Sequence, residues 1–482
     1  MRLFHRFADA LPELAVDWRA ETAPGPVLLA LDEDLATELG LDPAWLRSED
    51  GVRLLTGERP PEGARPVAQG YAGHQFGGWS PRLGDGRALL LGELDTPDGR
   101  TVDLHLKGSG RTSLSRGDDG LAVVGPMLRE HLVSTAMHAL GIPTTRALGV
   151  VATGRTVQRD APLPGAVLAR VAASHLRVGT VQYAAAHAAQ HGDTDLLERV
   201  VRFAAERHHP DVLEADRPAL ALLERVVEVQ ARLVAQWMAV GFVHGVINTD
   251  NVTLSGETID YGPCAFLDGF DQGAVFSSID TGGRYAFGQQ PAVLQWNLTR
   301  LAEALLPLVD TDQDQAVARC VEVLERFPAT YGEAYAALLA AKLGLPEGLE
   351  PVLRTDLVGD LLAIMQSARV DHTGFFRDLA REARGEGTPA RDRVLDLPAY
   401  DAWAARWRAL DPDPAAMDRV NPVRVPRNHV VQAALDAADA GDPTDVGRVL
   451  EAVRHPFEER PEWADLSVPG PDDGSFVTYC GT

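Results

Sequence analysis

The chain has 482 residues, with 45 Lys and Arg against 69 Asp and Glu, so its formal net charge is −24. This length predicts one large domain or two to three ordinary ones. Because a strongly acidic chain repels a phosphate backbone, we expect no nucleic-acid partner. If the protein binds a polyphosphate, it must build a local cluster of positive charge.

Cysteine usage and hydropathy indicate where the protein works. The three cysteines are Cys264, Cys320 and Cys480, and the absence of a CxxC pair predicts neither a disulfide framework nor a thiolate zinc site. The first residues lack a basic stretch followed by an apolar run, and 18 apolar residues never stand together. We therefore expect a cytoplasmic protein with no membrane partner.

The chain divides by composition into four predicted regions. Residues 1–60 form an extension of short surface helices, and residues 61–180 form a β-rich lobe. Residues 181–400 form a helical lobe that carries the catalytic and metal-binding loop, and residues 401–482 form a helical C-terminal extension and tail. A small β-rich lobe before a larger helical one predicts the α+β class.

The β-rich lobe is predicted to contain an antiparallel meander of three strands. After Gly70, β-rich runs alternate with turn clusters at residues 84–86 and 97–99. Side chains of a strand alternate between its faces. One face of the last strand therefore carries Val102, Leu104 and Leu106, and the other carries Asp103, His105 and Lys107.

A helix is predicted next, in GPMLREHLVSTAMHALGIP. Pro126 suits its first turn, apolar residues recur at helical spacing, and Gly141 and Pro143 stop it. Glu130 lies near the start of this helix. Two further strands are predicted in RALGVVATG and AVLARV, before a mostly helical remainder that begins at about Thr180.

A polar loop at residues 241–263, GFVHGVINTDNVTLSGETIDYGP, interrupts the helical remainder. Two short strands, VTL and TID, are predicted to flank a turn at residues 255–257. The loop offers Asp250 and Asn251, and the second strand ends in Asp260. Such oxygens suit a hard divalent cation that also binds ATP phosphates. Taken singly, however, each of these residues is more often part of a turn or a strand end.

The combination of these parts is typical of a protein-kinase-like, bilobal fold. In that fold a strand lysine, here Lys107, neutralises ATP phosphates, and a helix glutamate, here Glu130, holds the lysine in place. The loop LGDGRA fits a glycine-rich turn over the nucleotide, because glycine lets phosphate oxygens approach the backbone.

One position departs from the kinase pattern. Phosphotransferases of this fold carry HGDxxxxN, in which the Asp accepts the proton of the substrate hydroxyl, whereas this chain reads HGVINTDN. Val246 stands at the place of the base and cannot accept a proton, while another carboxylate, Asp250, stands beside Asn251. The residues alone leave three hypotheses open: an enzyme with different chemistry, a kinase-like phosphotransferase that uses Asp250 as its base, and a pseudokinase scaffold that binds ATP.

Longer strings carry a family resemblance. The chain resembles the selenoprotein O family, also called the YdiU family, in YAGHQFG, LGDGRA, LKGSGRT, SRGDDG, LGIPTTRALG, HGVINTDN, IDYGP, RYAFGQQPAVLQWNL and NPVRVPRNH. The resemblance covers nearly the whole chain. It implies a protein-kinase-like fold that binds ATP in an inverted orientation and transfers AMP to Ser, Thr or Tyr side chains of proteins, with release of pyrophosphate.

The resemblance also implies roles for single residues. Nucleotide contacts are implied for Gly84, Gly86, Arg87, Asp119 and Gly120. The phosphates that leave would be held by Lys107, Arg170 and Arg177, with Glu130 orienting Lys107. Mg²⁺ or Mn²⁺ would be ligated by Asn251 and Asp260, of which Asp260 also contacts the nucleotide. Asp250 would be the general base.

Proteins are the implied partners, with the chain itself as a further acceptor. Cys480 stands where the family carries a terminal Cys or selenocysteine, although Gly-Thr follows it here in place of two serines.

Overall fold

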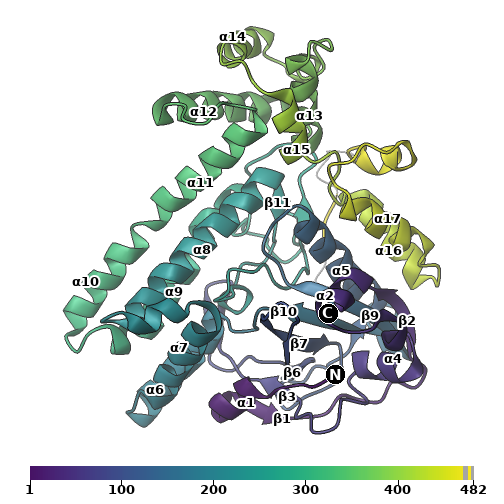
Figure 1. Ribbon diagram of the computed structural model, residues 1–482, viewed down its shortest axis with the longest axis vertical. Coiled ribbons are helices and arrows are strands. Elements are labelled where there is room, and N and C mark those ends of the chain that lie inside the picture. Colours follow the sequence, from purple (N-terminus) through teal and green to yellow (C-terminus); the bar gives the residue numbers. More distant parts are fainter. Residues whose placement is uncertain (471–475, 479–482) are drawn as a thin grey trace.

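The computed structural model describes residues 1–470 and 476–478, and Cys480 lies outside them. Its framework is an antiparallel sheet with helices on and beside it, so the protein combines α and β structure (Figure 1). The strands follow one another in space as β1 (Ala15–Asp17), β3 (Val67–Gln69), β6 (Ala88–Asp95), β7 (Thr101–Lys107), β10 (Pro162–Ala172), β9 (Arg146–Gln158) and β2 (Val27–Leu31), with β8 (Ala122–Val123) paired to β10.

Helices begin before the sheet is complete and dominate the chain after it. The first five are α1 (Arg6–Ala10), α2 (Glu33–Glu38), α3 (Pro43–Leu46), α4 (Glu49–Leu55) and α5 (Val124–Ala139). The next six are α6 (Val178–His191), α7 (Asp195–His208), α8 (Pro218–Val240), α9 (Gln290–Val309), α10 (Gln313–Leu324) and α11 (Phe327–Lys342). The last six are α12 (Pro351–Ala368), α13 (His372–Ala383), α14 (Leu397–Arg408), α15 (Pro414–Val420), α16 (Asn428–Asp439) and α17 (Thr444–Arg454).

The alternation predicted for the strand that ends at Lys107 is confirmed. Val102, Leu104 and Leu106 of β7 are buried in one apolar cluster together with residues of α2, α3 and α4. Asp103, His105 and Lys107 therefore lie on the opposite face, where Arg170 of β10 is the register partner of His105. The sheet thus brings Lys107 and Arg170 onto one face as diagonal neighbours.

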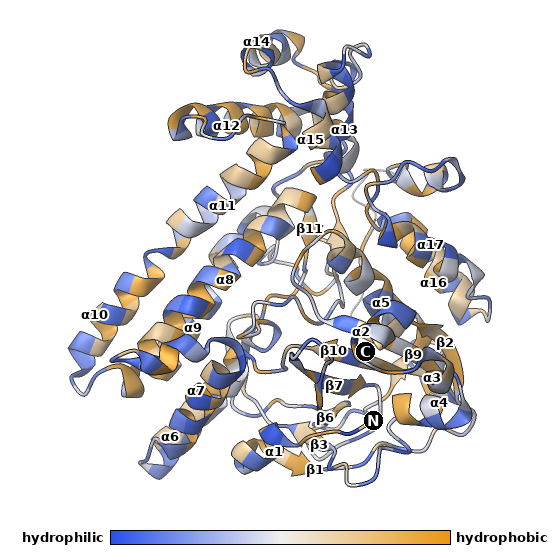
Figure 2. Cartoon of the chain, in the orientation of Figure 1, coloured by the Kyte–Doolittle hydropathy of each residue, from blue (hydrophilic) through white to orange (hydrophobic). Residues whose placement is uncertain are grey.

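The helix predicted around Glu130 and the two following strands are also confirmed, as α5, β9 and β10. Apolar residues of α5 pack with those of α16 and α17, so the C-terminal helices lie beside α5 in Figure 1. The remaining large helices share a second core with α8 and α9 at its centre. In Figure 2, hydrophobic and hydrophilic residues alternate along α8, as an amphipathic helix requires.

The predicted three-strand meander is wrong in its first strand. The YAGHQFGGW stretch forms a separate hairpin of β4 (Gly73–Gln75) and β5 (Gly78–Ser80), whereas β6 lies between β3 and β7 in the large sheet. The reason is a long-range contact, because the backbone N–H of His74 donates to Thr249 Oγ1 at 2.7 Å. This hydrogen bond joins β4 to the polar loop of the helical part.

The two short strands predicted after Asn251 are wrong as well. Thr253 and Thr258 each form only an isolated bridge, to Arg177 and Thr144 respectively. Side chains add further hydrogen bonds to this segment. Gln230 Nε2 donates to Thr253 O at 2.6 Å, and Trp237 Nε1 donates to Thr258 Oγ1 at 2.9 Å. The nearby strands are instead β11 (Phe242–Val243) and β12 (Ala265–Phe266).

Within residues 1–470 and 476–478, no helix combines the length and the apolar character that crossing a membrane requires.

Candidate active site

One cavity of about 620 Å³ is lined by every residue that the sequence predicts for the site. The sheet and α5 contribute Lys107, Glu130 and Arg170, and the loop before β6 contributes the glycine-rich turn. The polar loop after α8 contributes Asp250, Asn251 and Asp260. The cavity, called the cleft below, therefore joins residues that lie more than 150 positions apart in the chain.

Lys107 is held by two carboxylates at the end of β7. Its Nζ lies 2.7 Å from Glu130 Oε2 of α5 and 2.8 Å from Asp260 Oδ1. The side chains of Lys107 and Glu130 are both buried. A lysine fixed in this way is a point charge aimed into the cleft rather than a mobile surface side chain.

Two arginines complete a cluster of buried cations. Arg170 Nε lies 3.0 Å from Glu130 Oε1, and Arg170 Nη2 lies 2.9 Å from Asp260 Oδ1. Both Nε and the third nitrogen, Nη1, are buried and have no hydrogen-bond partner among the described residues, although Nε is ion-paired with Glu130. Arg177, at the start of α6, lies 3.7 Å from Asp260 and places its guanidinium over the ring of Tyr71.

The cluster is a local excess of positive charge in an acidic chain. Lys107, Arg170 and Arg177 face two carboxylates, those of Glu130 and Asp260. An unpaired buried donor costs free energy unless a ligand satisfies it, so Arg170 Nη1 marks a place for an acceptor oxygen. Arginine donors in fixed geometry suit phosphate oxygens.

Asp260 takes the strained backbone conformation of the left-handed region, with φ of 60°. Burial alone would raise its pKa, but Lys107, Arg170 and Arg177 together hold the pKa of this carboxyl well below its usual value. Asp260 is therefore ionised at every physiological pH. Backbone strain of this kind persists where surrounding contacts enforce it, and it concentrates at functional sites.

Asp250 lies in a short 3₁₀ turn, Thr249–Asn251, at the floor of the cleft. Its Oδ2 accepts a hydrogen bond from Gln75 Nε2 at 3.2 Å, while its Oδ1 is buried without a partner among the described residues. Burial is the main cause that raises the pKa of Asp250 above the ordinary value. A carboxylate with a raised pKa and an unoccupied oxygen is suited to accept a proton.

Val246 also lines the cleft and is buried. Its backbone carbonyl accepts a hydrogen bond from Asn251 Nδ2 at 3.0 Å. This bond fixes the amide of Asn251 and leaves the amide oxygen for a cation. The position at which kinases carry their base thus presents an apolar side chain, and Asp250 supplies the carboxylate nearby.

The glycine-rich turn is packed tightly against residues 114–115. Gly84 has φ of 114°, and a Cβ there would come within 2.6 Å of Leu114 Cδ1. Asp85 between the two glycines is buried, and its Oδ2 accepts from the backbone N–H of Gln69 at 3.0 Å. Glycine at this position therefore allows both the turn and its close packing.

The remaining predicted nucleotide contacts border the same cleft. Gly86, Arg87 and Gly120 line it, as does Asp119, whose Oδ2 forms an ion pair with Arg159 Nη1 at 2.8 Å. Arg159 lines the cleft too. Arg159 was not predicted as a site residue, because it lies in the β9–β10 turn, 40 positions after Asp119 in the sequence.

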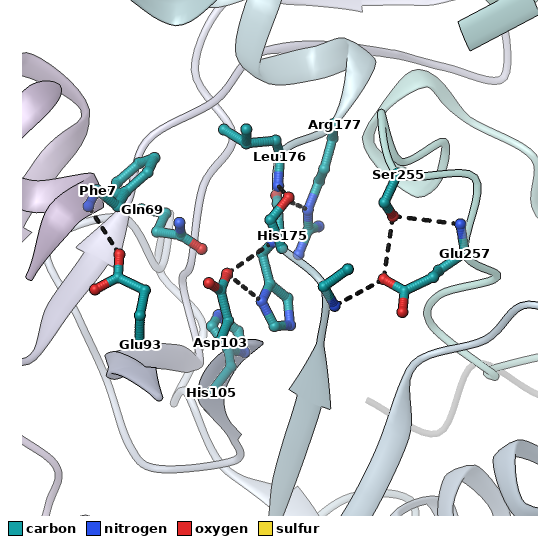
Figure 3. Close-up of polar contacts among 12 residues, drawn as sticks. Phe7, Gln69, Glu93, Asp103, His105, His175, Leu176, Arg177, Ser255 and Glu257 are labelled. Atoms are coloured by element: carbon teal, nitrogen blue, oxygen red, sulfur yellow. Dashed lines mark hydrogen bonds and ion pairs between the residues drawn. The ribbon is translucent and has the colours of Figure 1, made fainter. Parts of the chain in front are cut away.

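A buried polar network behind the cleft supports Arg177 (Figure 3). Asp103 Oδ2 accepts a hydrogen bond from the backbone N–H of His175 at 2.8 Å and lies 3.0 Å from His175 Nδ1. The ring of His105 stacks on that of His175 at 4.0 Å, and His105 Nε2 lies 3.0 Å from Asp85 Oδ2. The network therefore links the glycine-rich turn to the segment that carries Arg177.

Among the cleft residues that were not predicted as site residues are Gln75, Phe76, Asp85 and His105. The alternation of β7 was a usable signal for His105, since it shares a face with Lys107. The YAGHQFG string contained Gln75 and Phe76, but only the contact of the β4–β5 hairpin with the polar loop brings them to Asp250.

The described residues fit a metal only together with a ligand. No three His, Cys, Asp or Glu side chains of the described part of the chain cluster as a metal site. Asn251 and Asp260 both line the cleft and offer amide and carboxylate oxygens. Hard divalent cations accept this donor set when phosphates supply further oxygens.

A cleft with three buried cations, an ionised carboxylate and a second carboxylate poised to accept a proton defines a polyphosphate-binding enzyme of the transferase class. Comparison with known proteins agrees with this class. Residues 4–454 match the family model described as "Protein adenylyltransferase SelO", and the chain belongs to this family. The resemblance seen in the sequence is confirmed.

Named relatives cover the full length of the chain. A protein of Mycolicibacterium smegmatis is 59% identical over 481 residues, which are 100% of this chain and 98% of that protein. A protein of Pseudarthrobacter chlorophenolicus is 58% identical over 482 residues, covering 99% and 97%. A protein of Cereibacter sphaeroides is 53% identical over 486 residues, covering 100% and 99%. Each relative is named "Protein nucleotidyltransferase YdiU".

Proposed function

We propose that this protein transfers AMP from ATP to Ser, Thr or Tyr hydroxyls of proteins and releases pyrophosphate. The observation that carries the proposal is the convergence of Lys107, Arg170 and Arg177 in the same cleft as Asp250. Membership in the SelO family supports it, and so does the name of the relatives, which states protein nucleotidyl transfer.

In the proposed reaction, the acceptor hydroxyl oxygen attacks the α-phosphorus of ATP, and its proton passes to Asp250. The bond between the α-phosphorus and the oxygen that bridges to the β-phosphorus breaks, and pyrophosphate leaves with that electron pair. Lys107, Arg170 and Arg177 hold the leaving phosphates and stabilise their charge. Glu130 orients Lys107 and the Nε edge of Arg170, to which it is bonded.

Asn251 and Asp260 are the proposed ligands of Mg²⁺ or Mn²⁺. When bound, such a cation neutralises phosphate charge and helps to align the polyphosphate. Asp260 has a second task, because its carboxylate already bridges Lys107 and Arg170. The proposed nucleotide contacts are Gly84, Gly86, Arg87, Asp119 and Gly120, which line the same cleft.

The architecture supports a protein-kinase-like, bilobal arrangement. The sheet with α5 corresponds to the small lobe and the helices from α6 onward to the large lobe, so the proposed boundaries lie near residues 60, 180 and 400. Protein acceptors, including the chain itself, are the proposed partners. A cytoplasmic location is proposed from the cysteine usage.

The proposal competes with two others, a kinase-like phosphotransferase that uses Asp250 as its base and an ATP-binding scaffold. Val246 in the position of the kinase base disfavours the first, and the intact cation cluster disfavours the second. Mass spectrometry separates all three: incubation with ATP and Mg²⁺ or Mn²⁺ should add AMP to a serine, threonine or tyrosine. An added phosphate would replace the proposal with a kinase, and an unmodified acceptor would favour a scaffold.

A further inference from the structure

The β4–β5 hairpin is fastened to the loop that carries Asp250. Three consecutive hairpin residues each donate a hydrogen bond to this loop: His74 N to Thr249 Oγ1 at 2.7 Å, Gln75 Nε2 to Asp250 Oδ2 at 3.2 Å, and Phe76 N to Asn248 Oδ1 at 3.0 Å. The hairpin thereby forms a wall of the cleft beside the proposed base.

The turn of this hairpin has an unusual residue. Phe76 and Gly77 connect the two strands with φ of 51° and 83°, the left-handed pair of a type I′ turn. The first position of such a turn favours Asn, Asp or Gly, because a bulky side chain is strained there. Asn-Gly would form the turn with less strain than Phe-Gly.

Packing does not account for the phenylalanine either. The side chain of Phe76 is 42% exposed, and its ring meets Tyr285 edge-on at 5.2 Å. Five non-glycine residues of the described part of the chain have positive φ, and three of them, Phe76, Arg116 and Asp260, line the cleft. Strain that is gathered at one site points to a function there.

The surroundings of Phe76 indicate what it contacts. Phe76 and Ile279 both line the cleft, and both are largely exposed, at 42% and 50%. Phe76 follows Gln75, whose amide touches the carboxylate of Asp250. The exposed ring of Phe76 therefore stands one residue from the side chain that touches Asp250, in the same cleft that a hydroxyl must enter to give its proton to Asp250.

We propose that Phe76, with Ile279, binds the acceptor protein by packing against an apolar side chain next to the hydroxyl residue. This inference rests on the proposed function and adds the recognition of the acceptor to it. The phenylalanine ring makes this contact, although Asn at the same position would form the turn with less strain. Phe76 is a specificity-determining residue, while the phosphates are held by the cations described above.

The test uses the full chain and synthetic peptides with a central Ser, flanked on both sides either by Leu or by Asp. The wild type should transfer AMP to the Leu-flanked peptide with a kcat/KM about ten-fold or more above that of the Asp-flanked one, since a well-packed apolar contact discriminates to about this degree. Phe76→Asn should reduce this ratio to near one and keep the ATP affinity. It should also melt at a higher temperature, because the turn is relieved. Phe76→Tyr should restore the preference.

Trp45→Ala serves as the matched control, because Trp45 is an aromatic residue of similar exposure, 40%, on α3 and outside the cleft. This variant should keep the peptide preference of the wild type. An unchanged preference of Phe76→Asn for the Leu-flanked peptide overturns the inference. A loss of ATP affinity with this preference intact also overturns it, because Phe76 would then contact the nucleotide. A wild type that labels neither peptide while it modifies proteins also overturns it. A wild type that transfers no AMP to any acceptor refutes the proposed function itself.

Discussion

Replacing Arg170 by glutamine tests the phosphate-binding cluster most sharply. The side chain of Arg170 is 3% exposed. Its Nη2 is hydrogen-bonded to Asp260 and its Nε is ion-paired with Glu130, whereas Nη1 has no hydrogen-bond partner among the described residues. A phosphate at Nη1 would form one charge-assisted hydrogen bond, worth about 1.5–3 kcal/mol. Arg170→Gln should therefore weaken ATP binding by about ten- to a hundred-fold.

The measurement is equilibrium titration of the variant with ATP and with AMP, both with Mg²⁺. AMP lacks the β- and γ-phosphates, so its affinity should change far less, and the ratio of the two affinities is insensitive to any unfolded fraction. Arg427→Gln is the matched control, because Arg427 is equally buried and pairs with two carboxylates, Asp268 and Asp371, away from the cleft. If Arg170→Gln weakened the binding of ATP and of AMP equally, Arg170 would not hold the outer phosphates. The same change in the affinity ratio in Arg427→Gln would refute that role as well.

Three more predictions concern carboxylates. Asp250→Asn should lower transfer by about 10²–10⁴-fold at unchanged ATP affinity. In the wild type, the rate should fall as the pH drops through the pKa of Asp250, which burial raises above 3.8. A metal chelator should lower the ATP affinity of the wild type. Asp260→Asn should have this lower affinity already, and the chelator should not change it further. Burial raises the pKa of Glu257 from 4.5 to about 7, so folding favours its protonated form and stability is lost as the pH rises through this range. Glu257→Gln should thus raise the free energy of unfolding at pH 8 by up to about 3 kcal/mol and leave it unchanged at pH 4. An equal rise at both pH values would contradict the raised pKa of Glu257 as the cause.

Local patterns predicted the elements whose contacts are local. The alternation around Lys107 and the helical spacing around Glu130 each follow from a few consecutive residues, and the structure has both. The β4–β5 hairpin was misplaced because its partners lie about 175 positions later, in residues 248–250. The alternation of side chains along a strand does not predict which distant loop the strand will contact.

Most residues of the candidate site lie in the family strings, whereas Glu130, Arg170 and Arg177 lie outside them. The electrostatics of the site were not predictable, since the buried pairing of Asp260 with Lys107 and Arg170 depends on the three-dimensional approach of β7, β10 and the polar loop. Phe76 was overlooked for a related reason. Only its positive φ and its exposure beside Asp250 separate it from an ordinary strand phenylalanine.

The central claim, transfer of AMP rather than of phosphate, is tested most directly by parallel incubations with ATP labelled on the α-phosphate and ATP labelled on the γ-phosphate. Purified protein with Mg²⁺ or Mn²⁺ should transfer the α label to a protein acceptor and release the γ label as pyrophosphate. Asp250→Asn should transfer the α label about 10²–10⁴-fold more slowly than the wild type. Incorporation of the γ label alone would contradict the account.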